Sequence, residues 1–371
     1  MKVLWSGPFH YADSFSSVNR NMVMALKAAG VDVGIVPADL VGMHHPVDMY
    51  AMTRDMLDGL KRVGEGGPAG RRCVWTGAPG AAHKSEKGAY YTTWETAPLS
   101  AEYADRLKRW RRVWVPSRFC REAFLASGLK EERVRVVPHG VNLKVFDALR
   151  TPVHRPRYLP GSPYAFAFSG TVCPRKNWGT LLNAFLGEFR PGEDAALLMF
   201  VTGSQAGRAA ALIGKEALRR PGLLTTDGAV VFSWSPFAAV EALPPGLSDT
   251  EYATRMNVAD CWVSVTHGEG YGLTALEALA LGKPVISPKW GGVTEFLTEE
   301  NARFVPHEEV PLNGKAAYVM CDVRAQDVGA AMREEYRLGR RRNTAGYETA
   351  RSFSYDTIAA GRVMEELEDL T

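Results

Sequence analysis

The sequence predicts an α/β protein built from two doubly wound parallel sheets, and three observations favour this class. Strand-like and helix-like stretches alternate in both halves of the chain, which is typical of parallel sheets covered by helices. The stretch TPVHRPRYLPGSP at residues 151–163 is rich in proline and basic residues, lacks periodicity, and is predicted to be a linker. A chain of 371 residues is also long for one compact domain, so two are expected.

Residues 1–150 are expected to form the first domain. Short apolar runs predict strands, and stretches with apolar positions at helical spacing predict helices. The predicted strands are residues 2–7, 31–37, 71–76, 89–94, 112–116 and 134–138. The predicted helices are residues 14–29, 98–110 and 118–127.

Residues 164–352 are expected to form the second domain by the same alternation. The predicted strands are residues 164–169, 196–202, 229–233, 259–265, 283–287, 302–305 and 317–321. The predicted helices are residues 177–189, 248–258, 272–281 and 324–338. The run YDTIAAGRVMEELEDL has apolar positions at helical spacing, so a further helix is predicted within residues 354–371.

The loop before the helix at residues 272–281 is the most informative stretch of the sequence for function. DCWVSVTHG is predicted to be a buried strand with a loop, and LTALEALALG a helix that ends at Gly282. A helix N-terminus has free N–H groups and the positive end of the helix dipole, and both favour a phosphate. The loop brings four candidate phosphate-binding residues to that N-terminus: Gly270, Tyr271, Gly272 and Leu273.

Two carboxylates flank this loop. Glu269 lies on the loop, and Glu277 lies about one and a half turns into the helix. Both are expected to point into the same cleft. Because like charges repel, carboxylates beside a phosphate are better suited to accept hydrogen bonds from sugar hydroxyls. The loop and the two glutamates together predict a nucleotide-sugar pocket.

The stretch EGYGLTALE closely resembles the acidic motif of the family 4 retaining glycosyltransferases (glycosyl transferases group 1). Other blocks resemble the same family, in the family's order, and the resemblance covers most of residues 89–300. These blocks are VWVPSRFCREAFLASG (113–128) followed by VRVVPHGVNLKVF (134–146), FSGTVCPRKNWGTLLNAF (168–185) and KPVISPKWGGVTEF (283–296).

This family has the GT-B fold, in which two Rossmann-like domains face a cleft and a C-terminal helix crosses back to the first domain. The resemblance implies that the first domain faces the acceptor and the second binds the donor. It implies a retaining enzyme that transfers a hexose of the mannose or glucose type from a nucleotide diphosphate sugar to a glycan, a glycolipid or another lipid-linked or small-molecule acceptor. The alternatives are a GT-B nucleotide-sugar epimerase, a glycosyltransferase acting on nucleic acid, and a catalytically silent binding module.

The stretch SGTVCPRKN (169–177) holds the second group of candidate residues, in a strand end that runs through Gly170 and Thr171 toward a helix. Arg175 and Lys176 are expected to neutralise the donor's diphosphate and to stabilise the charge that develops as the nucleoside diphosphate departs. The family commonly has an arginine directly after the glycine, where this chain has Thr171. The family's lysine matches Lys176, and Arg175 is expected to replace the missing arginine. A solvated basic turn is the alternative.

Acceptor contacts are expected on loops of the first domain. The stretch SGPFHYADSFSS (6–17) corresponds to the family's glycine-rich loop, but it retains only Gly7 and lacks the usual pair of glycines. His10, Tyr11 and Asp13 are therefore candidates for acceptor specificity.

The stretch TTWETAPL (92–99) lies where many relatives have a histidine near the reactive face of the sugar, and it holds Trp94 and Glu95 instead. Glu95 is expected either to bind donor or acceptor hydroxyls or to cap the helix that starts near Pro98. His139 lies at the hinge between the domains, where the family often has asparagine, and a structural hydrogen bond is expected there.

No cofactor and no metal are expected. The sequence has no Asp-x-Asp pair at a strand end, the usual means of holding Mg²⁺ or Mn²⁺ against a diphosphate. His44, His45 and Asp48 form its only metal-like cluster, and a surface loop or an acceptor contact is favoured there. Metal-independent transfer from a UDP-sugar or GDP-sugar is therefore predicted.

The segment RLKRWRR at residues 106–112 gathers basic side chains around Trp110: Arg106, Lys108, Arg109, Arg111 and Arg112. A solvated helix face is favoured. The functional alternative is contact with an anionic membrane surface, as in peripheral glycosyltransferases with lipid acceptors. A nucleic-acid-binding patch is the weaker interpretation, because basic residues elsewhere in the sequence do not form a stripe interleaved with aromatic residues.

Composition agrees with an enzyme in the cytoplasm. The net charge of +3 is too small to indicate nucleic-acid binding by itself. The five cysteines are an odd number without metal-binding spacing, which favours reduced thiols. The sequence starts with a strand rather than a signal peptide, and no apolar run approaches the roughly 18 residues of a spanning helix. Peripheral contact with the inner face of the membrane is kept as an alternative.

Overall fold

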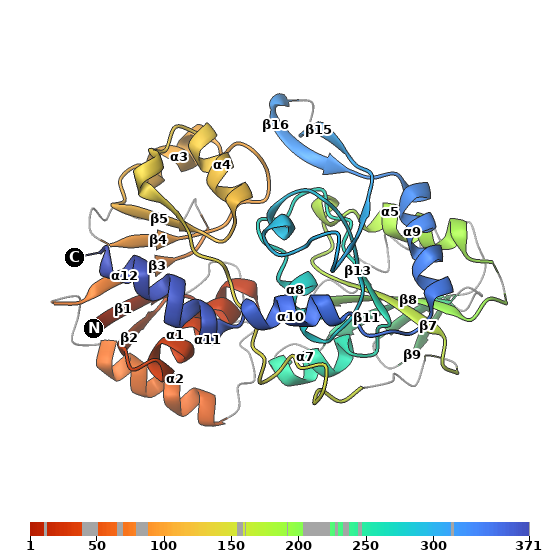
Figure 1. Ribbon diagram of the computed structural model, residues 1–371, viewed down its shortest axis with the longest axis horizontal. Helices are drawn as coiled ribbons and strands as arrows, with labels where there is room; N and C mark the ends of the chain where they lie inside the picture. Colours follow the sequence, from red (N-terminus) through yellow and green to blue (C-terminus); the bar gives the residue numbers. More distant parts are fainter. Residues whose placement is uncertain are drawn as a thin grey trace.

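The structure is a computed structural model of the chain. It describes residues 1–10, 13–38, 51–64, 70–78, 88–153, 159, 161–190, 192–202, 223–226, 229–232, 237–243, 247–312 and 315–370. Figure 1 shows two lobes side by side, each built around its own sheet.

The first sheet is parallel throughout, with the strand order β2-β1-β3-β4-β5-β6. Its strands are β1 (Lys2–Gly7), β2 (Asp32–Pro37), β3 (Arg72–Thr76), β4 (Ala89–Tyr91), β5 (Arg112–Val115) and β6 (Val134–Val136). The helices of this lobe are α1 (Ser14–Ala28), α2 (Ala51–Gly64), α3 (Ala101–Leu107) and α4 (Arg118–Ala126). The predicted strands all occur. Helix α2 was missed, and the predicted helix at 98–110 is shorter at both ends.

The second sheet has the order β14-β13-β12-β7-β8-β11-β10-β9. Its strands are β7 (Tyr164–Ser169), β8 (Ala195–Thr202), β9 (Leu223–Thr226), β10 (Ala229–Phe232), β11 (Phe237–Leu243), β12 (Cys261–Val263), β13 (Val285–Pro288) and β14 (Arg303–Val305). Strand β10 is antiparallel to β9 and β11, whereas the other neighbouring strands are parallel. The predicted fold class, two doubly wound Rossmann-like lobes, is confirmed, with this antiparallel edge as an addition.

Helices cover the second sheet, and a hairpin extends from it. The helices are α5 (Trp178–Glu188), α7 (Asp249–Met256), α8 (Leu273–Ala280), α9 (Ala325–Leu338) and α10 (Thr344–Ser352). The strand predicted at 317–321 is part of a separate antiparallel hairpin, β15 (Glu308–Leu312) and β16 (Lys315–Asp322). An apolar run indicates a strand but not its pairing partner, so its absence from the main sheet could not be predicted.

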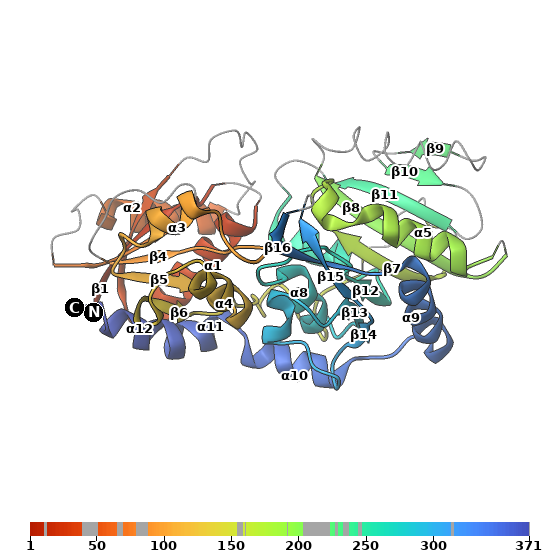
Figure 2. The same ribbon diagram turned by 90° about the horizontal axis from the view of Figure 1, so that it is seen from above.

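The C-terminal segment returns to the first lobe, where the two chain ends lie close together (Figures 1 and 2). It consists of α11 (Tyr355–Ile358), a π-helical turn (Ala359–Val363) and α12 (Met364–Glu368). Its apolar side chains pack into the core of the first sheet: Tyr355, Ile358, Ala359, Val363, Leu367 and Leu370. The boundaries predicted at residues 150 and 164 stay a prediction, and much of the 151–163 linker lies outside the described residues.

Candidate functional site

The acidic loop runs from β12 to α8, and glycines shape it. Gly272 has a φ of 93°, in the left-handed region, directly before the first residue of α8. A Cβ atom at Gly272 would collide with Val293, and one at Gly292 would collide with the Gly270 carbonyl oxygen. The Gly292 N–H donates to the Glu269 carbonyl oxygen over 2.6 Å. The turn after β13 therefore lies against the loop and holds its backbone in place.

The predicted helix after this loop is confirmed. It begins at Leu273, and Gly282, with a φ of 67°, follows its last turn. Its inner face is apolar and buried: Ala275, Leu276, Ala278, Leu279 and Ala280. Burial of this face fixes the position of the helix N-terminus, so the N–H groups there are held toward the loop.

Two cationic side chains, from the turn after β7, contact the acidic loop. Arg175 and Lys176 are in a short 3₁₀ turn (Pro174–Lys176) that follows β7. The Lys176 Nζ lies 2.7 Å from the Glu269 Oε2, and the Arg175 guanidinium lies 3.9 Å from the same oxygen. Arg175 also donates to the Gly268 carbonyl oxygen over 2.7 Å. Burial opposes ionisation of Glu269, but the two cations hold its pKa below the ordinary value.

The turn that carries the cations is itself fixed to the loop and to β7. The His267 N–H donates to the Arg175 carbonyl oxygen over 2.7 Å. A Cβ atom at Gly170 would lie 3.3 Å from the Lys176 side chain, so the lysine stem runs close over this glycine. Thr171 is exposed, and its carbonyl oxygen accepts a hydrogen bond of 3.0 Å from the Trp178 indole.

Glu277 has surroundings different from those of Glu269. It is half-buried in the middle of α8, and burial raises its pKa well above the ordinary value. The Asp249 carboxylate nearby raises it further. Burial also raises the pKa of Tyr252 and of Tyr355, and Glu277 adds to both shifts, so the three side chains are close enough to interact. Glu277 is thus suited to exchange hydrogen bonds with a ligand that carries hydroxyl groups.

Tyr271 faces the hinge between the lobes. Its hydroxyl donates to the His139 carbonyl oxygen over 2.5 Å. The His139 Nδ1 lies 2.6 Å from the Tyr91 hydroxyl oxygen, and burial lowers the pKa of His139 to about 3. The imidazole is therefore neutral at physiological pH, and the structural hydrogen bond expected for His139 is present.

The first lobe packs closely onto the acidic loop. The Ser117 hydroxyl donates to the Gly270 carbonyl oxygen over 2.8 Å, and the Cys120 thiol lies 3.2 Å from the same oxygen. A Cβ atom at Gly270 would collide with the Thr93 hydroxyl, and one at Gly268 would collide with the Glu95 carbonyl oxygen. Two glycines of the acidic loop therefore make this close approach of the lobes possible. Neither Ser117 nor Cys120 was a sequence candidate, because both have only the signal of a helix start.

Glu95 reaches across to the cations of the second lobe. Its Oε1 lies 3.4 Å from the Arg175 Nη2. Burial raises the pKa of Glu95, Arg175 opposes that shift, and Glu269 adds to it. The alternative of a helix cap at Glu95 is wrong, because α3 begins at Ala101 and the Ser100 side chain accepts the hydrogen bond from the Tyr103 N–H. The structure thus brings Glu95 together with Arg175, Lys176 and Glu269.

Trp94 and Gly7 have structural contacts. The Trp94 indole donates to the Pro98 carbonyl oxygen over 3.3 Å, and its half-buried ring packs edge-on against Tyr103. A Cβ atom at Gly7 would collide with the Thr76 hydroxyl, so Gly7 permits close packing of β1 against β3.

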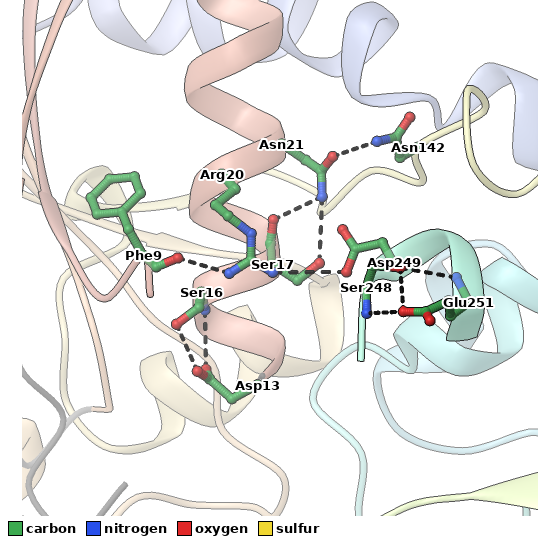
Figure 3. Close-up of polar contacts among 10 residues, drawn as sticks. All are labelled: Phe9, Asp13, Ser16, Ser17, Arg20, Asn21, Asn142, Ser248, Asp249 and Glu251. Atoms are coloured by element: carbon green, nitrogen blue, oxygen red, sulfur yellow. Dashed lines mark hydrogen bonds and ion pairs between the residues drawn. The ribbon is translucent and has the colours of Figure 1, made fainter. Parts of the chain in front are cut away.

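Asp13 has a structural contact at the start of α1. It caps α1 by accepting hydrogen bonds from the Ser16 N–H at 3.0 Å and from its hydroxyl at 2.6 Å (Figure 3). This cap contact satisfies the side chain locally and stabilises the helix start, and the acceptor-specificity role of Asp13 stays a prediction. His10 lies half-buried just before this cap, and Tyr11 lies outside the described residues.

A second contact between the lobes lies beside Glu277. Figure 3 shows Arg20, on α1, pointing across to Asp249 at the start of α7, with 3.8 Å between the guanidinium and the carboxylate. Arg20 also donates to the Phe9 carbonyl oxygen over 2.8 Å. Neither residue was a sequence candidate. Asp249 has only the signal of the Ser248–Glu251 capping box, and a lone arginine in an amphipathic helix has none.

The basic segment at residues 106–112 is largely neutralised. Trp110 is 1% exposed and packs against Trp75 and Tyr90, with ring centroids 5.0 Å away in each case. Trp110 is therefore a core residue and takes no part in a surface patch. Three of the basic side chains have carboxylate partners: Arg106 with Glu102, Lys108 with Asp105, and Arg112 with Asp369.

Two further statements apply to the described ranges alone. There, no helix combines the length and the apolar composition needed to cross a membrane. No group of three His, Cys, Asp or Glu side chains within those ranges is placed to hold a metal ion. His44, His45 and Asp48 lie outside them.

Known proteins resemble this chain in part by sequence and as a whole by fold. Residues 243–311, which hold the acidic loop and α8, match the family described as glycosyl transferases group 1. A D-inositol 3-phosphate glycosyltransferase of Thermobispora bispora is 32% identical over 166 residues, which is 44% of this chain and 36% of that protein. The chain thus matches little more than a third of the length of this curated relative.

Two solved structures share the architecture. HepE of Anabaena, in complex with UDP and glucose, superposes with a TM-score of 0.63 at 13% identity, and all of both chains is covered. A glycosyltransferase of Rickettsia africae superposes with a TM-score of 0.65 at 14% identity, covering 100% of this chain and 98% of that one. The fold is therefore the GT-B fold of glycosyltransferases, and residues 243–311 carry the group 1 sequence pattern.

Proposed function

We propose that the protein is a retaining glycosyltransferase that moves a hexose of the glucose or mannose type from a nucleoside diphosphate sugar to a hydroxyl-bearing acceptor. One observation carries the proposal: Lys176 and Arg175 form ion pairs with Glu269, on the loop that leads into α8. The cations and the helix N-terminus are suited to a diphosphate, and the carboxylate is suited to the hydroxyl groups of a sugar.

The diphosphate would bind to the positive part of this arrangement. Lys176, Arg175 and the N–H groups at the start of α8 supply fixed positive potential where a leaving nucleoside diphosphate develops negative charge. Fixed donors need no reorganisation as the reaction proceeds, which is why they lower the barrier. These groups take the place of a bridging metal ion, so the reaction is proposed to be metal-independent.

The two glutamates would bind hydroxyl groups of the donor. Glu269, kept ionised by Lys176 and Arg175, accepts from a sugar hydroxyl. Glu277, with Asp249 and tyrosine hydroxyls around it, binds the ribose. UDP is the first nucleotide to test because the fold relative HepE holds UDP. GDP-sugars are the second choice.

Transfer with retention is proposed to occur on one face of the sugar. The bond from the anomeric carbon to the phosphate oxygen breaks, and the acceptor oxygen forms its bond to the same carbon on the same face. The acceptor's proton moves to the departing phosphate oxygen. Glu269 interacts with Lys176 and Arg175, an arrangement suited to binding rather than to nucleophilic attack.

The acceptor would approach from the first lobe, past Glu95 and Trp94. Glycans, glycolipids and small molecules all remain acceptors to test. Inositol phosphates join this panel because the curated relatives are named for one. The acceptor-side assignments of Gly7, His10, Trp94 and Glu95 stay predictions.

The testing experiment begins with thermal shift against a panel of UDP- and GDP-sugars, followed by donor turnover with and without EDTA. We expect one sugar nucleotide to raise the melting temperature, and its slow hydrolysis to survive chelation. The anomeric configuration of a transfer product, read by NMR, checks retention. An epimerase would convert the donor without an acceptor, and a silent binding module would bind it without turnover, so either result would contradict the proposal.

A further inference from the structure

An ion pair between the lobes occupies one of the two cations of the proposed diphosphate site. Glu95, on the loop after β4, lies 3.4 Å from Arg175, on the turn after β7, and about a third of each side chain is exposed. The pair is positioned by the backbone as well as by charge. Gly268 leaves room for the Glu95 carbonyl oxygen, and Gly270 leaves room for the Thr93 hydroxyl.

The charges of this cluster already balance. Arg175 and Lys176 face the carboxylates of Glu95 and Glu269. A diphosphate brings further negative charge to the same cations. Because like charges repel at contact distance, one carboxylate has to move away from the cations or take up a proton.

Glu95 is the carboxylate that is held less firmly. Glu269 contacts Lys176 at 2.7 Å and has Arg175 as a second cation at 3.9 Å. Glu95 has the longer contact of 3.4 Å to Arg175, and it comes from the other lobe. Burial raises the pKa of Glu95 while Lys176 and Arg175 keep that of Glu269 low against the effect of its burial, so removing the charge of Glu95 costs less.

We propose that Glu95 occupies the donor diphosphate's place on Arg175 while the donor site is empty, and that donor binding releases it toward the acceptor. This inference rests on the proposed function and names the side chain that competes with the donor for Arg175.

The test measures the binding of inorganic pyrophosphate by calorimetry at constant ionic strength, with wild-type protein and Glu95→Gln. Glutamine keeps the shape of the side chain and removes its charge. We expect pyrophosphate to bind at least about fivefold more tightly to Glu95→Gln, the lower end of a typical coupling between sites. Glu102→Gln, which removes an exposed carboxylate on α3, is the matched control and should bind like the wild type.

A double-mutant cycle assigns the effect to the ion pair. In an Arg175→Ala background, Glu95→Gln should give no gain in pyrophosphate affinity, because the cation that Glu95 occupies is gone. A gain that persists without Arg175 would overturn the inference, since the effect would then be one of general charge.

Other outcomes also decide the matter. Equal or weaker binding to Glu95→Gln overturns the inference and makes the pair a structural tether between the lobes. If Glu95→Gln unfolds early in a thermal scan, Glu95→Asp is used, because its shorter side chain retracts the carboxylate from Arg175 and should also bind more tightly. Protein that binds no pyrophosphate in any form overturns the diphosphate site itself. If the fivefold gain is seen but no sugar nucleotide is turned over, the transferase proposal is contradicted and the inference about Glu95 stands.

Discussion

The Tyr271 hydroxyl donates a hydrogen bond of 2.5 Å to the His139 carbonyl oxygen, and both residues are buried. Tyr271 belongs to the acidic loop of the second lobe, whereas His139 follows β6 of the first. The bond therefore ties the acidic loop to the segment that leaves the first lobe, directly before Val141 pairs with the C-terminal crossing.

Tyr271→Phe should destabilise the protein by about 1–3 kcal/mol, because it leaves the buried His139 carbonyl oxygen without this donor. Urea unfolding of both proteins measures the difference. Tyr347→Phe, which removes a longer hydrogen bond of 3.4 Å to Asp147, is the control and should cost less. Wild-type stability in Tyr271→Phe would show that the bond is replaced.

His139 should make the protein less stable in mild acid. The pKa is about 3 in the folded protein against 6.5 ordinarily, so below pH 6.5 the unfolded chain takes up a proton that the folded protein does not. Stability is therefore full above this range and is lost as the pH falls, by about 2 kcal/mol at pH 5. His139→Asn should show a smaller loss between pH 8 and pH 5. His307→Asn controls for histidine content, and an equal loss in all three proteins would contradict the assignment.

Glu277→Ala should weaken donor binding at least about tenfold, since leaving a buried hydrogen-bond partner unsatisfied costs roughly 1–3 kcal/mol. Calorimetric titration with the donor found in the thermal-shift screen measures this loss. Glu348→Ala, at an exposed carboxylate on α10, is the control. Normal donor affinity in Glu277→Ala would refute the ribose contact.

Lys176→Ala should lower kcat by about 10²–10³, the usual effect of removing one fixed donor from a developing negative charge. Arg175→Ala should cost less, because Lys176 makes the shorter contact with Glu269. Steady-state kinetics at saturating donor separates kcat from KM. Lys144→Ala, at an exposed lysine, is the control, and a near-normal kcat in Lys176→Ala would exclude the proposed role.

Membrane contact of the basic segment is predicted from charge alone, because Trp110 lies in the core. Each basic residue near an anionic leaflet is worth about 1 kcal/mol, so replacing Arg109, Arg111 and Arg112 by Ser should release protein from anionic liposomes in a sedimentation assay at low salt. Replacing Arg324, Arg337 and Arg351 in the second lobe is the matched control. Wild-type protein that stays in the supernatant would favour a solvated, ion-paired surface.

The sequence by itself determined the local structure around the site. Apolar runs located β12 and β7, and the glycine pattern located the loop before α8 and the end of that helix. These features depend on neighbouring residues, since backbone conformation at a glycine and burial of one helix face are set within a few positions. Lys176 and Glu269 were separate sequence candidates. Each follows a strand of one parallel sheet, where the carboxyl ends share an edge, but their ion pair was not predicted.

The tertiary structure decided what the sequence left open. Glu95 could cap a helix or bind a ligand, and only the docking of its loop on Gly268 places it at Arg175. Trp110 lay among charges in the sequence, yet its ring turns into the core beside Trp75. Asp249 showed only the signal of a helix start, yet it meets Arg20 from the other lobe. Such contacts join segments far apart in the chain. Their energies depend on how these segments pack against each other, which cannot be predicted from a short stretch of sequence.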